Sequence, residues 1–489
     1  NWYQQDDEWR CKDKNGDDIY DAWAKSGADW YWLNDEGFMA REALVDGDTK
    51  YVDADGKMVK NDWKKVVDDE NNEHWMYFQA GGKKMVGKDT PKPVTVKGKK
   101  YIFDTNGYMM SGWVNDGDYD QPDEDNVWTG AVYFCGDAED GAVTYGWRQI
   151  EVVDENAADT IDQNYWFYFQ PSGKKVQAKE DCLTEKTVNG KKYAFNDTGA
   201  MVAEWEAVYA TQATASSTDI MEYAWFHTVE DGSKLAKGWF RVIPAENVDG
   251  DNNAEETAKW FYAKGGKLCK NCIKTINGKK YGFNDKGEMV VGLCAAEVGD
   301  SYTDVTFLST AIDAEPVMTA AVTNGEYDKV DYSGAVLYYF SADEDNDGSM
   351  KTGAQTVTVD GDDYNFYFST KNVDKGMGIT RKQGNKFYYN GKKVAADDSV
   401  AEFQFFDYDA TLDAVSYEAN TDPDTVKVPY GKDGEIVNAV NASKYKLIGK
   451  TGTIATSGTK KDGNGNKYVF KKVAKDTAYP DGVWILDVE

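Results

Sequence analysis

The side chains that usually carry out catalysis are scarce in this sequence. Among 489 residues there are only two histidines, His74 and His227, and neither lies beside a plausible nucleophile motif. A Ser–His or Cys–His catalytic system is therefore not expected, and we interpret both histidines as surface residues of strands. The 85 acidic residues offer many possible carboxylate pairs. However, the repeated hairpins described below predict a narrow array, which offers no deep cleft for glycoside hydrolysis. The sequence predicts a protein that is not an enzyme.

Six cysteines in so long a chain are too few for a disulfide framework. The segment Cys269-Lys-Asn-Cys272 has the spacing of half a zinc site or of a redox pair. No second pair and no nearby histidine completes such a site. We therefore expect either a local disulfide or free thiols.

One acidic segment resembles the start of a calcium-binding loop. Residues 343–348 match the pattern Asp-x-Asp-x-Asp-Gly, in which alternate oxygens and a glycine turn wrap a hard cation. The twelfth position is Ala354 in place of glutamate. Two interpretations stay open: a weak or incomplete calcium site formed by Asp343, Asp345 and Asp347, or an acidic hairpin turn. No other cofactor is expected.

The charge of the chain disfavours some partners. Acidic residues outnumber basic ones 85 to 55, which gives a formal net charge of -30. Such a surface repels nucleic-acid phosphates and anionic lipid heads, and no apolar run of about 18 residues or more could span a bilayer. Nucleic-acid binding and membrane insertion are therefore not expected, whereas a neutral sugar or a cationic head group would not be repelled.

Aromatic residues, which make up 14% of the chain, recur in a short repeated unit. In the copy that starts at Gly190, Tyr193 and Phe195 are two positions apart, so both rings point to one face of a strand. The following Asn-Asp-Thr-Gly199 supplies a turn with glycine at a positive-φ position, and the preceding Asn189-Gly190 favours a type I′ turn. Each copy therefore predicts a β-hairpin. Equivalent copies begin at Gly98 and Gly278.

Three kinds of hairpin alternate along the chain. A second kind carries tryptophan, as in residues 166–169 (Trp-Phe-Tyr-Phe), and a third kind is represented by residues 224–226 (Ala-Trp-Phe). Each kind recurs at the same long interval: 92 positions separate Tyr101 from Tyr193, and 92 separate Trp113 from Trp205. The repeating unit is thus three hairpins, roughly 90 residues.

A single hairpin of this size has one apolar face and no second layer to bury it against. Stacking on neighbouring hairpins solves this problem, so the sequence predicts an all-β fold, a β-solenoid of stacked hairpins with three hairpins per super-repeat. We expect residues 29–397 to form this solenoid and residues 1–28 to form a partial repeat or a cap. Residues 398–489 keep only fragments of the pattern and are predicted to be a degenerate terminal repeat or a small capping β-domain.

The tryptophan hairpins carry a family resemblance. The pattern Trp-(Tyr/Phe)-Tyr-Phe, turn residues with glycine, an apolar position and then Gly-Trp resembles the cell-wall-binding repeats of choline-binding proteins, glucan-binding modules and the repetitive tails of large clostridial toxins. It appears here as residues 166–169 with Gly173, and in pairs such as Gly146-Trp147. The resemblance covers most of residues 29–397. It implies a β-solenoid on a secreted or surface protein of a bacterium, with ligands held between consecutive repeats.

The resemblance also implies where a ligand would bind. In the choline-binding version, two tryptophans and a tyrosine surround a quaternary ammonium through cation–π attraction. For a sugar, the same rings would stack on the apolar faces of pyranoses while polar neighbours bond the hydroxyls. Long loops between each Gly-Trp and the next tryptophan depart from the choline-binding pattern. Each tryptophan could instead belong purely to the packed core. The residues carried over recur once per super-repeat: Trp63, Trp75 and Tyr77; Trp147, Trp166 and Tyr168; Trp239, Trp260 and Tyr262.

These inferences lead to one leading hypothesis and two alternatives. We expect a non-catalytic bacterial protein, secreted or at the cell surface, that binds cell-wall polysaccharide or an α-glucan such as starch or dextran through several weak sites. The alternatives are a choline-binding wall anchor, and a structural spacer or host-protein-binding surface with no small ligand. The chain is expected to be a monomer, and an export signal is expected to lie outside the printed residues.

Overall fold

The chain folds as two compact units in the computed structural model. The first comprises Asn1–Thr214 with Trp225–Lys234, and the second comprises Ala215–Ala224 with Leu235–Glu489. In the part of the chain that the structure describes, no helix is long and apolar enough to cross a membrane. The structure describes all residues except 120–125, 158–161, 210–216, 301–303, 309–311, 313–333, 360, 398–401, 431–433, 463, 473–477 and 488–489.

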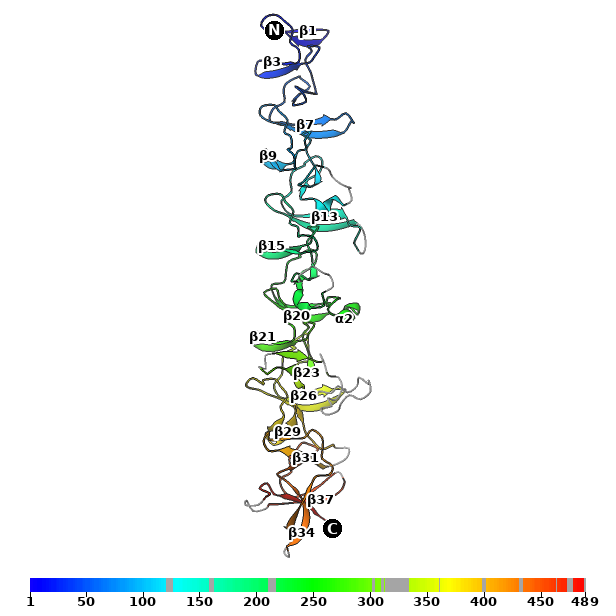
Figure 1. The fold of residues 1–489 in the computed structure, drawn as a ribbon, viewed down its shortest axis with the longest axis vertical. Helices are drawn as coiled ribbons and strands as arrows, with labels where there is room; N and C mark the ends of the chain where they lie inside the picture. Colours follow the sequence, from blue (N-terminus) through cyan, green and yellow to red (C-terminus); the bar gives the residue numbers. More distant parts are fainter. Residues whose placement is uncertain are drawn as a thin grey trace. The chain divides into compact units, whose positions relative to one another are not determined.

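The first unit is a succession of two-stranded antiparallel hairpins that follow one another in chain order (Figure 1). A short helix, α1 (Val127–Gly130), lies between the two strands of one hairpin. The hairpin strands, in pairs, are β1 (Trp2–Gln5) and β2 (Glu8–Cys11), β3 (Ala22–Ser26) and β4 (Asp29–Leu33), β5 (Ala43–Val45) and β6 (Lys50–Val52), β7 (Asp62–Val67) and β8 (Glu73–Phe78), β9 (Val94–Val96) and β10 (Lys99–Tyr101), β11 (Gly112–Val114) and β12 (Tyr133–Cys135), β13 (Gly146–Val153) and β14 (Asp162–Phe169), β15 (Thr184–Val188) and β16 (Lys191–Phe195), and β17 (Glu204–Glu206) and β18 (Ala224–Phe226).

The second unit begins with hairpins of the same kind and then builds larger sheets. Besides η1 (Ile220–Glu222) and α2 (Gly250–Ala254), its hairpins are β19 (Lys237–Val242) with β20 (Lys259–Lys264) and β21 (Cys272–Ile276) with β22 (Lys279–Phe283). The next two sheets are formed by β23 (Gly292–Val298), β24 (Val305–Phe307) and β25 (Val336–Phe340), and by β26 (Gly353–Val359), β27 (Asp362–Phe368), β28 (Arg381–Gln383), β29 (Lys386–Tyr389) and β30 (Lys392–Lys393).

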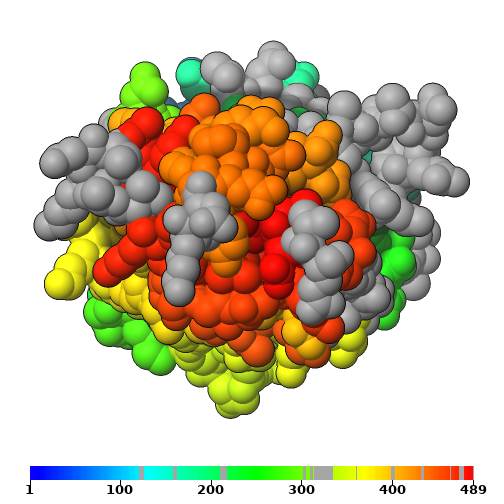
Figure 2. Space-filling model, turned by 90° about the horizontal axis from the view of Figure 1, so that it is seen from below, coloured from blue at the N-terminus to red at the C-terminus, as the bar shows by residue number. Residues whose placement is uncertain are grey.

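The C-terminal strands form a three-stranded and a five-stranded sheet, and they make up the face in orange and red in Figure 2. Their core contains Trp484, Leu447 and Phe405, all nearly inaccessible to solvent. The prediction of an all-β fold is confirmed, since α1, α2 and η1 are short pieces among many described strands. The three predicted segments 1–28, 29–397 and 398–489 stay predictions. The strands are β31 (Phe403–Asp409), β32 (Ala414–Val415), β33 (Thr425–Tyr430), β34 (Glu435–Asn441), β35 (Tyr445–Gly449), β36 (Thr459–Lys461), β37 (Lys467–Lys471) and β38 (Val483–Asp487).

The hairpin turns are formed by the residues that the sequence indicated. Val188 pairs with Lys191, so Asn189 and Gly190 form a two-residue loop. Their φ values are 49° and 81°, as a type I′ turn requires at both central positions. Asparagine and glycine enter this left-handed region at low cost. The turn fixes the register and therefore decides which side chains share a face.

The turn that follows several of the hairpins is held by an asparagine or aspartate side chain. After β16, the Oδ1 of Asn196 accepts hydrogen bonds from the backbone N–H groups of Thr198 (3.1 Å) and Ala200 (2.8 Å). Gly199 has a φ of 85°, and a Cβ there would lie 2.7 Å from the side chain of Lys175. Glycine is therefore required for both conformation and space.

Backbone hydrogen bonds join the residue after each turn to the second strand of the preceding hairpin. The donor is often methionine, and the acceptor is often the carbonyl oxygen of a tryptophan. Such bonds place consecutive hairpins in direct contact and satisfy edge groups that a lone hairpin would leave to water. The N–H to O distances are 2.8 Å for Met39 to Trp9, Met109 to Trp75 and Met201 to Trp166 in the first unit, and 2.8 Å for Met289 to Trp260 in the second.

Candidate functional site

The tryptophan at the start of each Trp-type hairpin lies opposite a tyrosine of the partner strand. Trp147 pairs with Tyr168 across β13 and β14, and the two residues therefore share one face of the hairpin. Their ring centroids are 5.2 Å apart. The same distance of 5.2 Å separates Trp63 from Tyr77 and Trp239 from Tyr262. Cross-strand pairing thus repeats one aromatic contact three times.

The following hairpin adds two more rings to each cluster. Trp147 lies edge-on to Tyr193 at 4.7 Å and is stacked on Phe195 at 5.7 Å. Equivalent centroid distances are 4.8 Å for Trp239 to Tyr281 and 5.8 Å for Trp239 to Phe283, and 4.9 Å for Trp63 to Tyr101 and 5.6 Å for Trp63 to Phe103. Rings from two consecutive hairpins thus surround the tryptophan of the first strand, so its side chain is half-buried.

In two copies a second tryptophan stands nearly perpendicular to the first and opens a cavity. Trp166 lies 6.4 Å from Trp147 with an interplanar angle of 83°, and Trp260 lies 6.3 Å from Trp239 at 86°. We refer to these as the Trp147 site, in the first unit, and the Trp239 site, in the second. The Trp147 site has a volume of about 350 Å³ and is lined by Trp147, Trp166, Tyr193, Met201, Glu230 and Asp231. The Trp239 site, of about 190 Å³, is lined by Trp239, Trp260, Tyr281, Met289 and residues 344–347.

A methionine forms one wall of each cavity, and a glycine from a later turn packs against it. A Cβ at Gly232 would lie 2.2 Å from Cε of Met201, and one at Gly348 would lie 2.6 Å from Cε of Met289. Glycine at these positions therefore lets the acidic turn approach the rings closely. Each cavity thus combines flat aromatic walls, a soft thioether and carboxylates at its edge.

In the copy at Trp63, a carboxylate bonds to the outer tryptophan. The indole Nε1 of Trp75 donates a hydrogen bond of 3.1 Å to Glu139, and Glu139 also lies 3.0 Å from Lys65. In the Trp239 site the indole of Trp260 donates likewise to Asp345 at 3.2 Å. In both copies a carboxylate of an acidic turn therefore accepts a hydrogen bond from the polar edge of the outer tryptophan.

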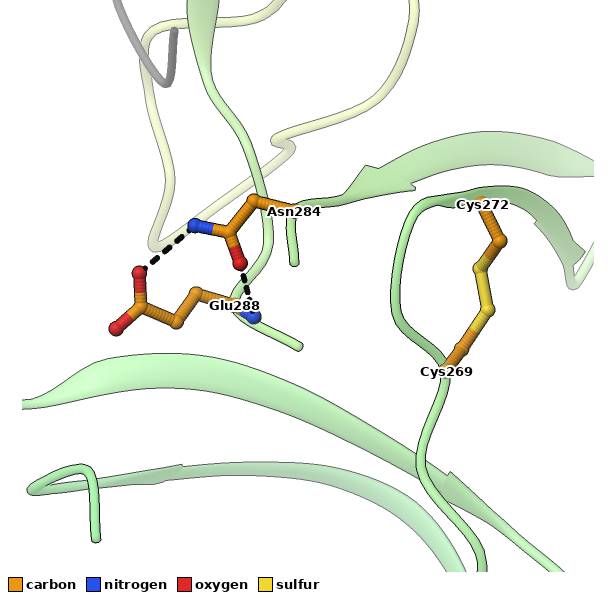
Figure 3. Close-up of a disulfide and its surroundings, with 4 residues drawn as sticks. All are labelled: Cys269, Cys272, Asn284 and Glu288. Atoms are coloured by element: carbon orange, nitrogen blue, oxygen red, sulfur yellow. Dashed lines mark hydrogen bonds between the residues drawn. A yellow bond between two sulfur atoms is a disulfide. The ribbon is translucent and has the colours of Figure 1, made fainter. Parts of the chain in front are cut away.

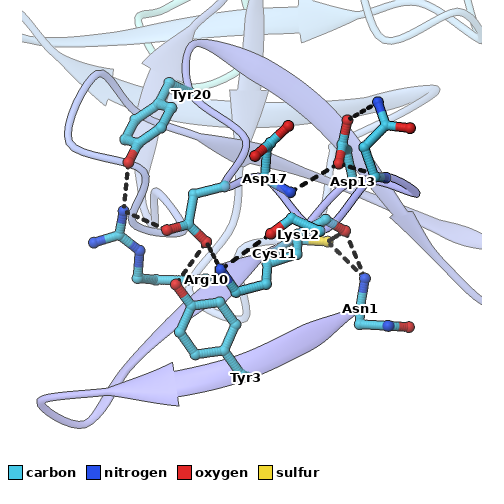
Figure 4. A network of polar contacts seen from close by, with 11 residues as sticks. Asn1, Tyr3, Arg10, Cys11, Lys12, Asp13, Asp17 and Tyr20 are labelled. Carbon is cyan, nitrogen blue, oxygen red and sulfur yellow. Dashed lines mark hydrogen bonds and ion pairs between the residues drawn. The ribbon is translucent and has the colours of Figure 1, made fainter.

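A further copy at the N-terminus was missed by sequence reasoning. A cavity of about 360 Å³ is lined there by Trp2, Trp9, Tyr31 and Met39, with Arg41 and Asp55 among the polar residues. Beside it, Tyr3 donates a 2.7 Å hydrogen bond to Asp18, and Lys12 pairs with the same carboxylate (Figure 4). These residues lie within or next to the segment 1–28. The spacing of Tyr31 and Met39 could have revealed the copy, because it is 8 positions here, as it is between Tyr193 and Met201 and between Tyr281 and Met289.

The structure brings the sequence-predicted rings together, but the tyrosine that lines each cavity is a different one. Tyr77 and Tyr262 are buried beneath their tryptophans, and Tyr77 is further held by a hydrogen bond to Asn61. Tyr168 is half-buried in the same position. The cavity walls instead use Tyr193 and Tyr281, which come from the following hairpin.

In the cluster around Trp113, a lysine of the chain lies against the tryptophan. Lys175 is buried, and its Nζ lies 5.3 Å from the ring centroid of Trp113. This ammonium donates hydrogen bonds to the carbonyl oxygens of Trp128 (2.7 Å) and Thr198 (2.6 Å). Burial lowers the pKa of Lys175 to about 7, while the carbonyls and the ring favour the charged form. At this interface between hairpins, the ammonium group of Lys175 occupies the space beside the indole ring of Trp113.

The predicted calcium ligands do not converge on one point. Asp343 accepts hydrogen bonds from Asn346, Asp345 accepts one from Trp260, and Asp347 pairs with Lys279 and Lys351. The hydrogen bond from Lys351 is the main cause that lowers the pKa of Asp347. Among the described residues no group of three or more His, Cys, Asp or Glu side chains could hold a metal ion. The three carboxylates thus bond to side chains of the chain itself, and the calcium site stays a prediction.

The two histidines lie apart from the cavities. His74 lies 2.9 Å from Asp68 and stacks on Tyr108 with a centroid distance of 3.9 Å. Hydrogen bonds from the backbone N–H of Asn72 and from His74 lower the pKa of Asp68 to about 2. His227 is partly buried at the end of β18. Neither histidine borders the rings that line the Trp147 or Trp239 site.

Cys269 and Cys272 form a disulfide, as one of the two open interpretations predicted (Figure 3). The disulfide lies at the start of β21 and packs with Trp239, Tyr281 and Met289 in one apolar cluster. Cys11, Cys135, Cys182 and Cys294 form no disulfide, and of these Cys182 is exposed. The bridge therefore supports the hairpin that supplies Tyr281 to the Trp239 site.

Comparisons with known proteins match these repeats. No protein-family model matches the chain. Glucosyltransferase-S of Streptococcus mutans is 25% identical over 283 residues, which are 54% of this chain and 16% of that protein. Glucosyltransferase-S of Streptococcus downei is 26% identical over 263 residues, or 14% of its length. The chain thus spans about one sixth of the length of the curated relatives it matches.

Solved structures from Streptococcus pneumoniae also match the chain. The modular autolysin LytC, in complex with a synthetic peptidoglycan ligand, matches with a TM-score of 0.34 and 17% identity, covering 62% of this chain and 56% of that one. The choline-binding domain of CbpL matches with a TM-score of 0.27 and 20% identity, covering 43% of this chain and 93% of that one. The resemblance to a family of cell-wall-binding and glucan-binding repeats that the sequence indicated is confirmed, and it rests on the sequence matches to glucosyltransferase-S.

Proposed function

We propose that the chain is a non-catalytic, carbohydrate-binding protein of a bacterium, either secreted or at the cell surface. It binds cell-wall polysaccharide or an α-glucan through its aromatic cavities. The observation that supports this proposal is the recurrence of one aromatic arrangement at Trp147–Trp166 and Trp239–Trp260, with ring distances that agree within about 0.1 Å. A pure core has no need to leave the same cavity beside the same pair of indoles in both units.

We further propose that the hairpins form a β-solenoid. The recurring hydrogen bonds from the residue after each turn to the preceding hairpin support this, because they join consecutive hairpins in a recurring way within each unit. Several weak sites on one chain would act together when a polymer binds. All the rings of each site come from one chain, so a monomer suffices.

A second candidate ligand is choline. The acidic residues at the cavity edges, Glu230 and Asp231 in one site and Asp345 in the other, favour a cation between the rings. A spacer or host-protein-binding surface with no small ligand is the remaining alternative. It predicts that the cavities bind neither sugar nor choline.

The test is a titration monitored by ¹³C-methyl NMR of Met201 and Met289, one reporter in each cavity. Maltotriose, isomaltotriose and choline chloride are added separately to the full chain. We expect both methyl signals to shift with at least one saccharide at millimolar concentration. A response to choline alone would select the wall-anchor alternative. If none of the three ligands moves either signal, the carbohydrate-binding proposal is wrong.

A further inference from the structure

A second cavity, which the aromatic sites do not explain, lies beside the Trp239 site. It has a volume of about 280 Å³ and shares Met289 and Glu344 with the aromatic cavity, so the two cavities are neighbours across one methionine. This volume is several times the roughly 30 Å³ that a water molecule occupies in the liquid. We call it the polar cavity. Its remaining lining residues are Asp249, Asn252, Lys259, Asn284, Asp285, Lys286, Glu288 and Val291.

Donors and acceptors alternate around the polar cavity and are held in place by one another. Asp249, only 2% exposed, accepts hydrogen bonds from Asn252 (2.6 Å) and pairs with Lys286 at 2.8 Å. Although burial disfavours its charged form, these partners lower the pKa of Asp249 to about 2. Asn284 donates to Glu288 Oε2 at 2.9 Å and accepts from the backbone N–H of Glu288 at 2.9 Å (Figure 3).

One buried carboxyl in this network has spare hydrogen-bonding capacity. Glu288 is only 5% exposed, and its carboxyl group shares a hydrogen bond with that of Asp249 when one of the two is protonated. Its Oε1 accepts no hydrogen bond from an N–H or O–H group of the described residues, so it can still accept one from a further polar molecule. Burial also raises the pKa of Glu288 to about 7, so the group can exist in either protonation state near neutral pH. A protonated carboxyl donates and accepts at once, as a hydroxyl partner requires.

The charges of the lining select the class of ligand. Asp249, Asp285, Glu288 and Glu344 outnumber Lys259 and Lys286, so an anion is disfavoured. Among the described residues no side chains are grouped as metal ligands. Interleaved amides, carboxyls and ammonium groups suit an uncharged molecule with many hydroxyls, because each hydroxyl both donates and accepts.

We propose that the polar cavity is a second subsite of the Trp239 site, which holds the hydroxyl-rich sugar unit next to the one that stacks on Trp239 and Trp260. The ligand of this site would therefore be a saccharide of at least two units, not choline. This inference rests on the proposed carbohydrate-binding function. It applies to one site only, because the residue before the methionine is Glu288 here but Ala200 in the Trp147 site and Tyr108 in the Trp63 copy.

The experiment compares ligand length at two methyl reporters of the same chain. Glucose, isomaltotriose and maltotriose are titrated into the full-length wild type, Glu288→Ala and Asn252→Ala, and the Met289 and Met201 signals are followed. We expect each variant to weaken trisaccharide binding at Met289 about tenfold, the loss that an unpaired hydroxyl group typically causes. Glucose binding at Met289 and all binding at Met201 should stay unchanged. Glu288→Gln, which still accepts a hydrogen bond, should restore most of the trisaccharide affinity.

The outcomes separate this inference from the proposed function. If no saccharide moves either methyl signal in the wild type, the carbohydrate-binding function itself fails. If the trisaccharides bind at Met289 with equal affinity in the wild type and in both variants, the polar subsite is wrong while the binding function stands. Far-ultraviolet circular dichroism of each variant shows whether it is folded, and Asn252→Ala, which changes a half-buried residue of α2, provides a second readout should Glu288→Ala perturb the fold.

Discussion

The Trp147 site and the Trp239 site have the same rings and different surroundings. Their indole–indole distances are 6.4 and 6.3 Å, yet the first cavity has a volume of about 350 Å³ and the second about 190 Å³. The rings come from strands whose register is fixed by tight turns, whereas the cavity edges come from loops that vary between repeats. The comparison shows that strand pairing sets the aromatic geometry and that loops set what each site can bind.

The largest expected effect concerns the arrangement of aromatic rings that the two sites share. Trp147→Ala and Trp239→Ala each remove a ring that contacts four other aromatic rings. We expect each substitution to lower the free energy of unfolding by about 3–5 kcal/mol, as for other large-to-small changes in cores. Urea unfolding, followed by intrinsic fluorescence, measures the change. A loss below about 1 kcal/mol at only one of the two positions would show that the clusters are not equivalent.

The next effect concerns the outer tryptophans. Trp166→Ala and Trp260→Ala remove the ring that faces the cavity, so each should weaken saccharide binding about tenfold or more at its own site. Binding at the other site should be unchanged. Methyl NMR of Met201 and Met289 in each variant gives both affinities from one titration. Trp75→Ala is the matched control, because Trp75 is the equivalent outer tryptophan of the Trp63 copy and lines neither cavity.

A pH experiment sharpens the difference between the two sites. Burial raises the pKa of Glu288 to about 7 in the folded state, above its ordinary value. Below pH 4 the group is protonated in both states and contributes nothing. As the pH rises, the unfolded chain ionises first, so folding becomes less favourable until the folded group also ionises near pH 7. Glu288→Gln should therefore raise stability by about 1–3 kcal/mol at pH 8 and leave it unchanged at pH 4.

The control for this prediction lies in the Trp147 site. Glu230 borders that cavity and is exposed, so Glu230→Gln should change stability little at either pH. Equal pH dependence of the two variants would contradict the assignment of a buried carboxyl to the Trp239 site. Chemical unfolding at pH 4, 6 and 8 supplies the comparison.

Features that depend on contacts within one hairpin could be predicted from the sequence, whereas features that depend on contacts between hairpins could not. Hairpins were predictable because Asn189-Gly190 and the two-residue spacing of Tyr193 and Phe195 act locally. The contact between Trp147 and Tyr168 was also predictable, since both belong to one hairpin. That Tyr193 lines the cavity depends on how one hairpin packs on the next, which local spacing does not specify.

The predicted calcium loop shows the same limit. Its oxygens have a suitable spacing in the chain, but Lys279, which is far away in sequence, pairs with Asp347 at 2.9 Å. A neutralising cation from another hairpin removes the need for a metal ion. The polar cavity was also beyond the sequence, because Asp249 and Glu288 come from different loops and neither has a pattern that points to the other.

The smallest effect concerns the disulfide, which only the Trp239 site has. Cys269→Ser with Cys272→Ser opens a loop of a few residues, and the loss of chain constraint should lower stability by about 1–2 kcal/mol. Because the bridge packs with Met289 and Tyr281, the Met289 signal should shift while Met201 stays in place. The corresponding hairpin of the Trp147 site has the single free thiol of Cys182, so Cys182→Ser should change neither signal. If the double variant leaves Met289 unmoved, the bridge supports the chain without shaping the site, and the two sites would then differ only through their loops.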